Sequence, residues 1–369
     1  MDTTATLDAT YAPVPQPPVG ALGLVLPTFP QDAASLLAPA SLAATCRGAE
    51  DAGAGALWAC DHLFWHRPAL ECLMALGAAA AATERAALGT CVLQLPLRSA
   101  AVVAKQAAAL QHLCGGRLVL GLGVGNHEGE YEAAGARFAS RGRDLDRGID
   151  ELRAAWMPGG ALASGRALGS GSPLGSGDTP GSGSALGSGR MPGSGDTPGS
   201  ASPGYVQLPE PDRVPIWIGG SSEAALARAA RRGDGWIPLF LSPARYSSAM
   251  ERLSEEASKA GRDPRGIARA VVIFASVGNL PDASSRGLSW MSSLYGLPPR
   301  AFARHLTAGP PRACADEIAS FYEAGAEHVA VFLTDDEPLH AFEEIAAELA
   351  VQAPLAGAGC LDAEMVPVP

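Results

Sequence analysis

The sequence has little positive charge, no paired cysteine motif and no long apolar run. Its 27 Lys and Arg residues are outnumbered by 38 Asp and Glu residues, which gives a net charge of −11 at pH 7. This balance argues against nucleic acid or an anionic membrane as the main partner, so we expect a small-molecule ligand. Charges or glycines break every apolar stretch before the roughly 18 residues that a membrane span needs, so we expect no membrane segment.

The seven cysteines are scattered along the chain and odd in number. None shows C-x-x-C spacing, which argues against a disulfide framework and against a zinc site. The first twenty residues include two aspartates and several prolines and lack a basic start, unlike a signal peptide. We therefore expect a cytoplasmic protein without a metal.

Short apolar runs rich in Val, Leu and Ile alternate with longer segments of helical spacing. The pattern predicts strands near 20–26, 56–60, 86–94, 117–124, 214–218, 234–238, 270–277 and 328–333. It predicts helices near 39–53, 69–82, 99–113, 141–156, 222–232, 243–260, 312–324 and 338–351. Eight strand–helix units predict a single closed (β/α)8 TIM barrel, with the helices outside and the strands buried on both faces.

One segment departs from this alternation. Residues 157–204 are almost entirely Gly, Ser, Pro, Ala, Leu and Arg, and residues 185–202 nearly repeat residues 167–184. This composition cannot bury enough apolar surface to offset its ordering entropy, so we expect a long disordered insertion in a barrel spanning 20–354. A lid or a partner-binding segment is the alternative. Residues 1–19 and 355–369 are predicted to be flexible extensions.

The carboxyl ends of the strands are where a barrel of this kind carries its chemistry. After the second predicted strand come Asp61 and His62, followed by Trp65. His62 could act as an acid, a base or a hydrogen-bond donor, but a His beside an Asp at a strand end can also be a structural pair. Trp65 could stack on a planar ligand or simply belong to the core.

Two glycine turns follow the fourth and fifth predicted strands. Residues 121–125 begin like a dinucleotide fingerprint, but Asn126 stands where its third glycine is required. Gly219 and Gly220 precede Ser221 and a helix with an acid in its first turn, an arrangement that suits a phosphate or is merely a tight capped turn. Two such turns on neighbouring strands could bind one anion together.

Other polar residues are weaker candidates. His127, Glu128 and Glu130 resemble metal ligands but lie in a predicted irregular loop with no matching second cluster, so we predict no metal there. Cys91 lies within an apolar strand with no neighbouring base in sequence, which favours packing over nucleophilic chemistry.

Three segments in this order resemble the bacterial luciferase-like superfamily, and within it the oxidoreductases that use the deazaflavin coenzyme F420: "LWACDHLFW", "ALGTCVLQLPLRSAAVVAKQAAALQHLCGGRLVLGLGVGNHEGEYEAAGARFASRGRDLDRGIDELRAAW" and "VPIWIGGSSEAALARAARRGDGWIP". The resemblance covers about 20–156 and 204–350. It implies a barrel that holds F420 or FMN at its carboxyl-terminal mouth, and it implies that the glycine cluster is a barrel turn rather than a Rossmann loop.

The resemblance also implies roles for individual residues. His62, with Asp61, would lie near the reactive ring and transfer a proton or orient the substrate. A cis peptide at Cys91-Val92 would form a bulge behind the ring. The implied cofactor-binding residues are Trp65, Cys91, Val92, Gly123, Gly125, Asn126, His127, Gly219, Gly220 and Ser221. Some relatives carry a glutamate as proton donor where this chain has Asn126, which leaves Glu128 or Glu130 as weak substitutes.

The leading hypothesis is an F420-dependent oxidoreductase that transfers a hydride between the deazaflavin and a small organic substrate. The first alternative is an FMN-dependent monooxygenase that uses reduced flavin and oxygen, with a flavin reductase as partner. The second is a catalytically silent barrel that binds a cofactor or a partner. Variable loops, including 279–311, are expected to form the outer wall of the substrate pocket, and a homodimer is possible.

Overall fold

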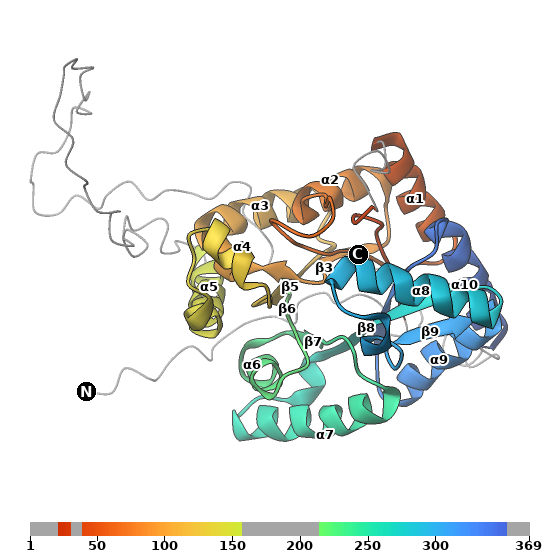
Figure 1. Ribbon diagram of the computed structural model, residues 1–369. Coiled ribbons are helices and arrows are strands. Elements are labelled where there is room, and N and C mark those ends of the chain that lie inside the picture. The colour runs from red at the N-terminus through yellow and green to blue at the C-terminus, as the bar shows by residue number, and fades with distance from the viewer. Residues whose placement is uncertain (1–20, 31–38, 157–213, 353–369) are drawn as a thin grey trace, which may run out of the picture.

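A computed structural model describes residues 21–30, 39–156 and 214–352 of the chain, and these residues form a closed parallel barrel with helices around it (Figure 1). The barrel strands are β1 (Ala21–Val25), β2 (Ala56–Ala59), β3 (Ala87–Thr90) with its continuation β4 (Leu93–Gln94), β5 (Leu118–Gly123), β6 (Ile216–Gly219), β7 (Gly235–Ile237), β8 (Ala268–Val277) and β10 (His328–Leu333). They pair in this order, and β10 closes the ring by pairing with both β8 and β1.

The helices lie around the outside of this ring of strands, except for one, described below, that crosses its open end (Figure 1). They are α1 (Pro39–Asp51), α2 (Cys72–Ala82), α3 (Ala100–Leu113), α4 (Glu128–Ala133), α5 (Arg141–Trp156), α6 (Glu223–Arg232), α7 (Pro243–Lys259), α8 (Leu280–Tyr295), α9 (Pro311–Glu323) and α10 (Pro338–Gln352). The predicted (β/α)8 barrel is therefore confirmed. The predicted disordered insertion and both flexible extensions lie outside the described residues. Within the described ranges, no helix combines the length and the apolar character that crossing a membrane requires.

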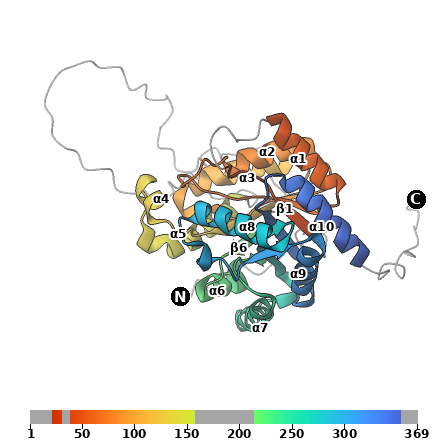
Figure 2. The same ribbon diagram turned by 45° about the vertical axis from the view of Figure 1, so that its right-hand side comes forward.

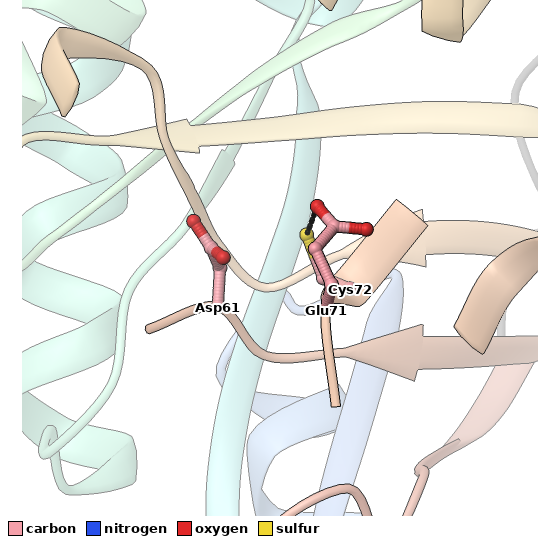
Figure 3. A group of neighbouring side chains, drawn as sticks. All are labelled: Asp61, Glu71 and Cys72. Atoms are coloured by element: carbon pink, nitrogen blue, oxygen red, sulfur yellow. Dashed lines mark hydrogen bonds between the residues drawn. The ribbon is translucent and has the colours of Figure 1, made fainter. Parts of the chain in front are cut away.

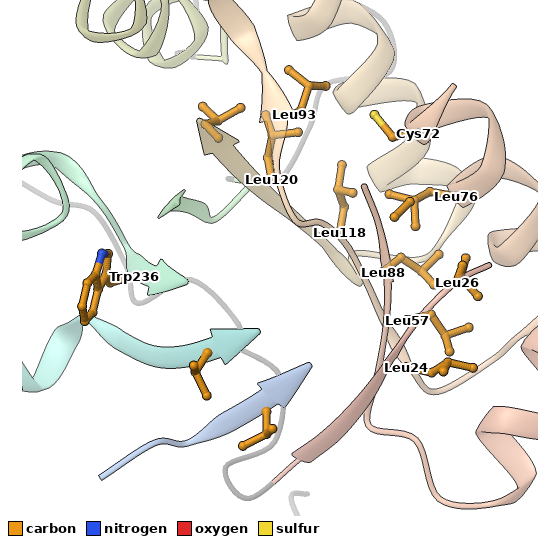
Figure 4. Close-up of a cluster of buried hydrophobic side chains, with 14 of the residues drawn as sticks. Leu24, Leu26, Leu57, Cys72, Leu76, Leu88, Leu93, Leu118, Leu120 and Trp236 are labelled. Carbon is orange, nitrogen blue, oxygen red and sulfur yellow. The ribbon is translucent and has the colours of Figure 1, made fainter. Parts of the chain in front are cut away.

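Alternate residues of the strands enter two separate apolar layers, as buried parallel strands require. The outer layer lies between the strands and the helices, where Leu24 and Leu57 pack with Leu76 of α2 (Figure 4). The inner layer fills the barrel and includes Val25 and Trp58 from the same two strands. Because both faces are covered, these strands are nearly continuous apolar runs.

Two tryptophans fill the inside of the barrel. The rings of Trp58 and Trp217 lie 5.3 Å apart, and both side chains are buried. A Cβ atom at Gly23 would lie 2.5 Å from Trp58, and one at Gly89 would lie 2.2 Å from it. Glycine is therefore needed on both neighbouring strands because the indole of Trp58 occupies the space of their side chains.

Two elements in 279–311 correct the prediction of loops there. α8 occupies Leu280–Tyr295, and β9 (Leu306–Gly309) pairs with the end of β8. α8 is rich in Ser and contains Gly287, so its helical propensity is low, and a few buried contacts such as Met291 hold it in place. In Figure 2, α8 crosses in front of the strands.

Two other predicted boundaries differ from the structure. The strand predicted at 86–94 is interrupted between β3 and β4 by a cis peptide bond at Cys91-Val92, at the position that the resemblance implied. The loop predicted around Glu128 and Glu130 is wrong, because α4 begins at Glu128 and buries Glu130 and Tyr131.

Candidate active site

A cavity of about 430 Å³ opens at the carboxyl ends of the barrel strands. Its polar part is lined by Asp61, His62, Gln94, Asn126, Ser221 and Ser222 and by the backbone of Gly123, Gly125, Gly219 and Gly220. Its apolar part is lined by Phe29, Leu239, Phe240, Val272, Phe274, Leu294, Tyr295 and Phe332. Cys60, Cys91, Val92 and Val124 complete the lining.

The two glycine turns lie side by side at the mouth of the barrel. β5 and β6 are parallel neighbours, with Leu122 paired to Ile218, so the turns that follow them leave the sheet at the same end. Gly125 has φ +66° and Gly220 has φ +104°, a backbone region that favours glycine. The predicted proximity of these turns is therefore confirmed.

The backbone of these turns is exposed to the cavity because the glycines carry no side chains. A Cβ atom at Gly125 would lie 1.8 Å from Oε1 of Gln94. Val92 occupies the space above Gly123 and Gly219, where a Cβ atom would lie 2.4 Å and 2.5 Å from its methyl groups. Val92 and Gln94 therefore pack directly on the main chain of these turns, and both line the cavity beside the glycines.

Contacts at the far side of the β6–α6 turn fix its position. Trp236 donates a hydrogen bond from Nε1 to the carbonyl oxygen of Gly220 at 3.0 Å, and the Ser221 hydroxyl donates to the carbonyl oxygen of Leu239. Ser222 caps α6 by accepting from the amide of Ala225 at 3.2 Å. The first amides of α6 have no partners within the helix, so this turn presents donors to an anion.

Asp61 is a structural acid in this site. Its buried carboxylate accepts from Nη1 and Nη2 of Arg98 at 2.6 Å and 2.7 Å, and from the amide of Gln94 at 2.9 Å. Both oxygens are thus occupied by a bidentate guanidinium, the strongest geometry for such a pair. Asp61 therefore ties the loop after β2 to the segment just before α3, and its charge is neutralised by Arg98.

His62 is paired with Glu130, which comes from α4. Nδ1 of His62 lies 2.9 Å from Oε2 of Glu130, and the imidazole side chain is 18% exposed. The other nitrogen, Nε2, has no hydrogen-bond partner in the described part of the chain. The ring is held between Trp65, which stacks on it at 3.7 Å, and Phe29, whose edge lies 5.7 Å away.

Glu130 is fully buried but remains an acceptor. Oε1 accepts from the amides of Leu63 and Phe64 at 2.7 Å and 3.1 Å, while Oε2 lies 3.3 Å from Nε2 of Gln94. Burial alone would raise the pKa of Glu130, but the hydrogen bonds from His62, Phe64 and Gln94 outweigh it and lower the pKa. Because the carboxylate is ionised, Nδ1 of His62 donates to it, and Nε2 is the basic nitrogen next to the cavity.

Trp65 and His127, which were predicted to bind the cofactor, lie behind the His62–Glu130 pair. Neither Trp65 nor His127 is part of the cavity lining that the structure describes. Trp65 backs the His62 ring, and the ring of His127 meets Trp65 edge-on at 5.3 Å. The other eight predicted cofactor residues line the cavity: Cys91, Val92, Gly123, Gly125, Asn126, Gly219, Gly220 and Ser221.

The apolar part of the cavity lining, from Phe29 to Phe332 as listed above and called the apolar wall from here on, was not predicted from the sequence. Phe240 has φ +61°, which is uncommon for a bulky residue, and its ring packs against Phe274 at 5.6 Å and Tyr295 at 5.6 Å. These residues come from the segment after β7, from β8 and from α8, which lie apart in the sequence. A left-handed phenylalanine carries no sequence signal, and the helix that supplies Tyr295 was not predicted.

One group near the site has metal-ligand chemistry. Asp61, Glu71 and Cys72 place ligand atoms within 4.8 Å of one another, as Figure 3 shows. Arg98 already provides the positive charge, since it is bidentate to Asp61 and lies 3.5 Å from Glu71. Burial, followed by the charges of the two acids, raises the pKa of Cys72 well above its ordinary value and keeps it a thiol. We assign no metal to this group.

This chain matches a known protein family and a curated protein. A family model described as luciferase-like monooxygenase matches residues 21–328. A phthiodiolone/phenolphthiodiolone dimycocerosates ketoreductase of Mycobacterium tuberculosis (strain ATCC 25618 / H37Rv) is 30% identical over 226 residues, which are 60% of this chain and 52% of the ketoreductase. The chain thus spans about half the length of this curated relative.

Solved structures share the fold at low sequence identity. An F420-dependent secondary alcohol dehydrogenase in complex with an F420-acetone adduct superposes with a TM-score of 0.68 and 18% identity, covering 89% of this chain and 98% of the dehydrogenase. The oxygenating constituent of 3,6-diketocamphane monooxygenase from Pseudomonas putida, in complex with FMN, gives a TM-score of 0.64 and 16% identity, covering 90% of this chain and 98% of that one. At such identities the likeness supports the barrel alone.

Proposed function

Because the chain belongs to the luciferase-like monooxygenase family of oxidoreductases, we propose that it transfers a hydride between coenzyme F420 and the carbonyl or alcohol carbon of a small organic substrate. The observation that carries this proposal is the His62–Glu130 pair beside the cavity. Reduction of a carbonyl needs a proton at the oxygen when the hydride reaches the carbon, and a histidine oriented by a carboxylate suits this task.

The residues present fit a phosphorylated cofactor with a planar heterocycle. The two glycine turns that contain Gly125 and Gly220, together called the glycine cradle, line the cavity with main chain, whose amides suit an anionic tail. Oε1 of Gln94 is buried without a partner, so the site holds an acceptor for a donor group of the ring. The apolar wall around Phe240 and Phe274 suits an aromatic ring and an apolar substrate.

When bound, the cofactor supplies the hydride chemistry, and the protein positions the reactants and moves the proton. Glu130 accepts from Nδ1 of His62 and keeps Nε2 directed at the substrate oxygen, where Nε2 takes the proton from an alcohol in one direction and, as the imidazolium, gives it to a carbonyl oxygen in the other. Asp61 and Arg98 fix the loop that carries His62. The turns after β5 and β6, with Asn126 and Ser221, would hold the tail. Trp65 supports the histidine ring from behind.

The Mycobacterium tuberculosis relative is named a ketoreductase, which supports reduction of a carbonyl rather than oxygenation. The FMN-dependent monooxygenase with a partner reductase is the second candidate, because the cradle and the apolar wall accept a flavin equally well. A silent barrel has no use for a buried acid that orients a cavity-lining histidine. The homodimer and the cytoplasmic location stay predictions.

Titration of the purified chain with F420 and, separately, with FMN distinguishes the two candidates. Each titration follows the absorbance or fluorescence of the cofactor. We expect F420 to bind more tightly and its reduced form to be oxidised by ketones under anaerobic conditions. Tight FMN binding without affinity for F420, with oxygen consumption in the presence of reduced FMN, would instead establish the monooxygenase.

A further inference from the structure

Two cysteines face each other in the wall of the cavity. Cys60 follows β2 and Cys91 follows β3, and the register of these parallel strands pairs Ala59 with Thr90, which places the two cysteines next to each other. Their Sγ atoms lie 3.5 Å apart, and Sγ of Cys60 donates to the carbonyl oxygen of Cys91 at 3.4 Å. Both residues line the cavity, so a small solute can reach them.

The geometry suits a disulfide. Neighbouring strands lie roughly 4.8 Å apart, within the Cα separation of roughly 4.4–6.8 Å that disulfides accept. The Sγ atoms need to approach by about 1.5 Å to reach a bond length of about 2.05 Å, which rotation of the two side chains can provide. Among the cysteines that the structure describes, this is the pair whose Sγ atoms are in hydrogen-bond contact.

We propose that Cys60 and Cys91 are an oxidative modification site, a thiol pair that hydrogen peroxide converts into an intramolecular disulfide in the wall of the cavity. The Cys60 thiolate attacks the O–O bond of peroxide, which gives a sulfenic acid and releases hydroxide. The Cys91 sulfur then attacks the Cys60 sulfur, forms the S–S bond and releases a second hydroxide. The two thiol protons convert both hydroxides into water, and the two electrons lost by the sulfurs reduce one peroxide.

The order of attack follows from the surroundings of the thiols. The hydrogen bond with Cys60, together with burial, raises the pKa of Cys91 well above its ordinary value. Cys91 is therefore a poor first nucleophile at neutral pH and acts as the resolving thiol. Both thiols are partly exposed, so exposure does not set the order, and Cys60 is the sulfur that attacks first because Cys91 is the poorer nucleophile.

The disulfide would join two residues, Cys60 and Cys91, that are each followed by another residue of the cavity lining. Cys60 precedes Asp61, and Cys91 precedes Val92, which packs over Gly123 and Gly219. Drawing the two sulfurs together shifts these residues, so oxidation is expected to weaken cofactor binding at least tenfold. This consequence rests on the proposed function, whereas formation of the disulfide does not.

The experiment treats the reduced full-length protein with hydrogen peroxide, blocks the remaining thiols under denaturing conditions and maps the peptides without reduction. Because trypsin does not cut between Arg67 and Pro68, Cys60 and Cys72 share one tryptic peptide, and fragmentation must assign the linked sulfur. We expect a Cys60–Cys91 link that dithiothreitol reverses. It should be absent in Cys60→Ser and retained in the matched control Cys314→Ser, whose thiol is buried away from this cavity.

A link through Cys72, or sulfinic acid at Cys60 or Cys91 without any link, overturns the inference. F420 titration of the reduced and oxidised wild type then separates the two proposals. If the link forms but even the reduced protein does not bind F420, the proposed function fails and the thiol pair stands. If reduced and oxidised protein bind F420 equally well, the expected effect on the site is wrong.

Discussion

Replacing Glu130 with glutamine inverts the hydrogen bonding of His62 with little change in shape. The amides of Leu63 and Phe64 both donate to Oε1, so the side-chain oxygen of the glutamine must stay at that position. The new NH2 group then replaces Oε2, 2.9 Å from Nδ1 of His62. Nδ1 must become an acceptor, which moves the ring proton to Nε2 and leaves the cavity with a donor in place of a base.

Glu130→Gln is expected to lower both turnover and stability. General acid–base catalysis contributes about 10²–10⁴-fold, so Glu130→Gln should lower turnover by about that factor. Hydrogen bonds to a charged acceptor are worth about 1 kcal/mol more than neutral ones, and the new NH2 also faces Nε2 of Gln94. We expect a loss of about 2–4 kcal/mol in the free energy of unfolding, measured in urea.

The pH dependence of stability gives an independent check. Because the folded-state pKa of Glu130 is lowered, its contribution is complete above the unfolded-state pKa of about 4.3 and is lost as the pH falls through the folded-state pKa. Glu130→Gln should lack this component of acid destabilisation.

The assay is long-range 1H–15N correlation spectroscopy of histidine-labelled protein, with His62→Ala to assign the ring. Wild type should show the Nδ1–H tautomer and Glu130→Gln the Nε2–H tautomer. The matched control Glu128→Gln, at an exposed residue of the same helix, should behave as wild type. An unchanged tautomer and an unchanged pH profile of turnover in Glu130→Gln would show that Glu130 does not set the position of the ring proton of His62.

Three further results are expected. His62→Ala should lower turnover about 10²–10⁴-fold and change cofactor affinity less than tenfold; equal turnover removes His62 from the mechanism. Gly125→Ala should weaken cofactor binding more than tenfold, because its Cβ would lie 1.8 Å from Gln94. The control Gly115→Ala, at φ +61° with open space around its Cβ, should bind the cofactor normally. Equal affinities of the two variants in calorimetry would contradict a role of the Gly125 turn in cofactor binding. Burial lowers the pKa of His328 to about 4 in the folded state, from about 6.5 when unfolded, so its contribution to stability is complete above pH 6.5 and is lost as the pH falls to 4. Over this range the free energy of unfolding of wild type should fall by about 3 kcal/mol more than that of His328→Leu. Urea midpoints that change in parallel in the two proteins would contradict this expectation.

The sequence predicted the barrel because buried parallel strands are apolar on both faces and leave a strong pattern. Asp61, His62 and both glycine turns were singled out because strand ends mark where the chemistry of a barrel lies, and all of them line the cavity. The strand pairing of β5 and β6 then brought the two turns together as expected.

The contacts that give these residues their roles were not predictable in the same way. His62 and Glu130 are 68 residues apart, and Glu130 faces His62 only because a short helix forms where the polar sequence indicated a loop. Arg98 neutralises Asp61 from a separate segment, and nothing local to either residue indicates the pair. α8 was missed because a Ser-rich helix with low propensity is held by tertiary contacts.

A crystal structure of the chain with F420 would show directly where the cofactor binds. We expect the phosphate at the turns after β5 and β6, within hydrogen-bond distance of the amides near Gly125 and Ser221, and the deazaflavin between the apolar wall and His62. A phosphate bound at the amino-terminal end of the barrel, or a ring placed away from His62, would contradict this expectation.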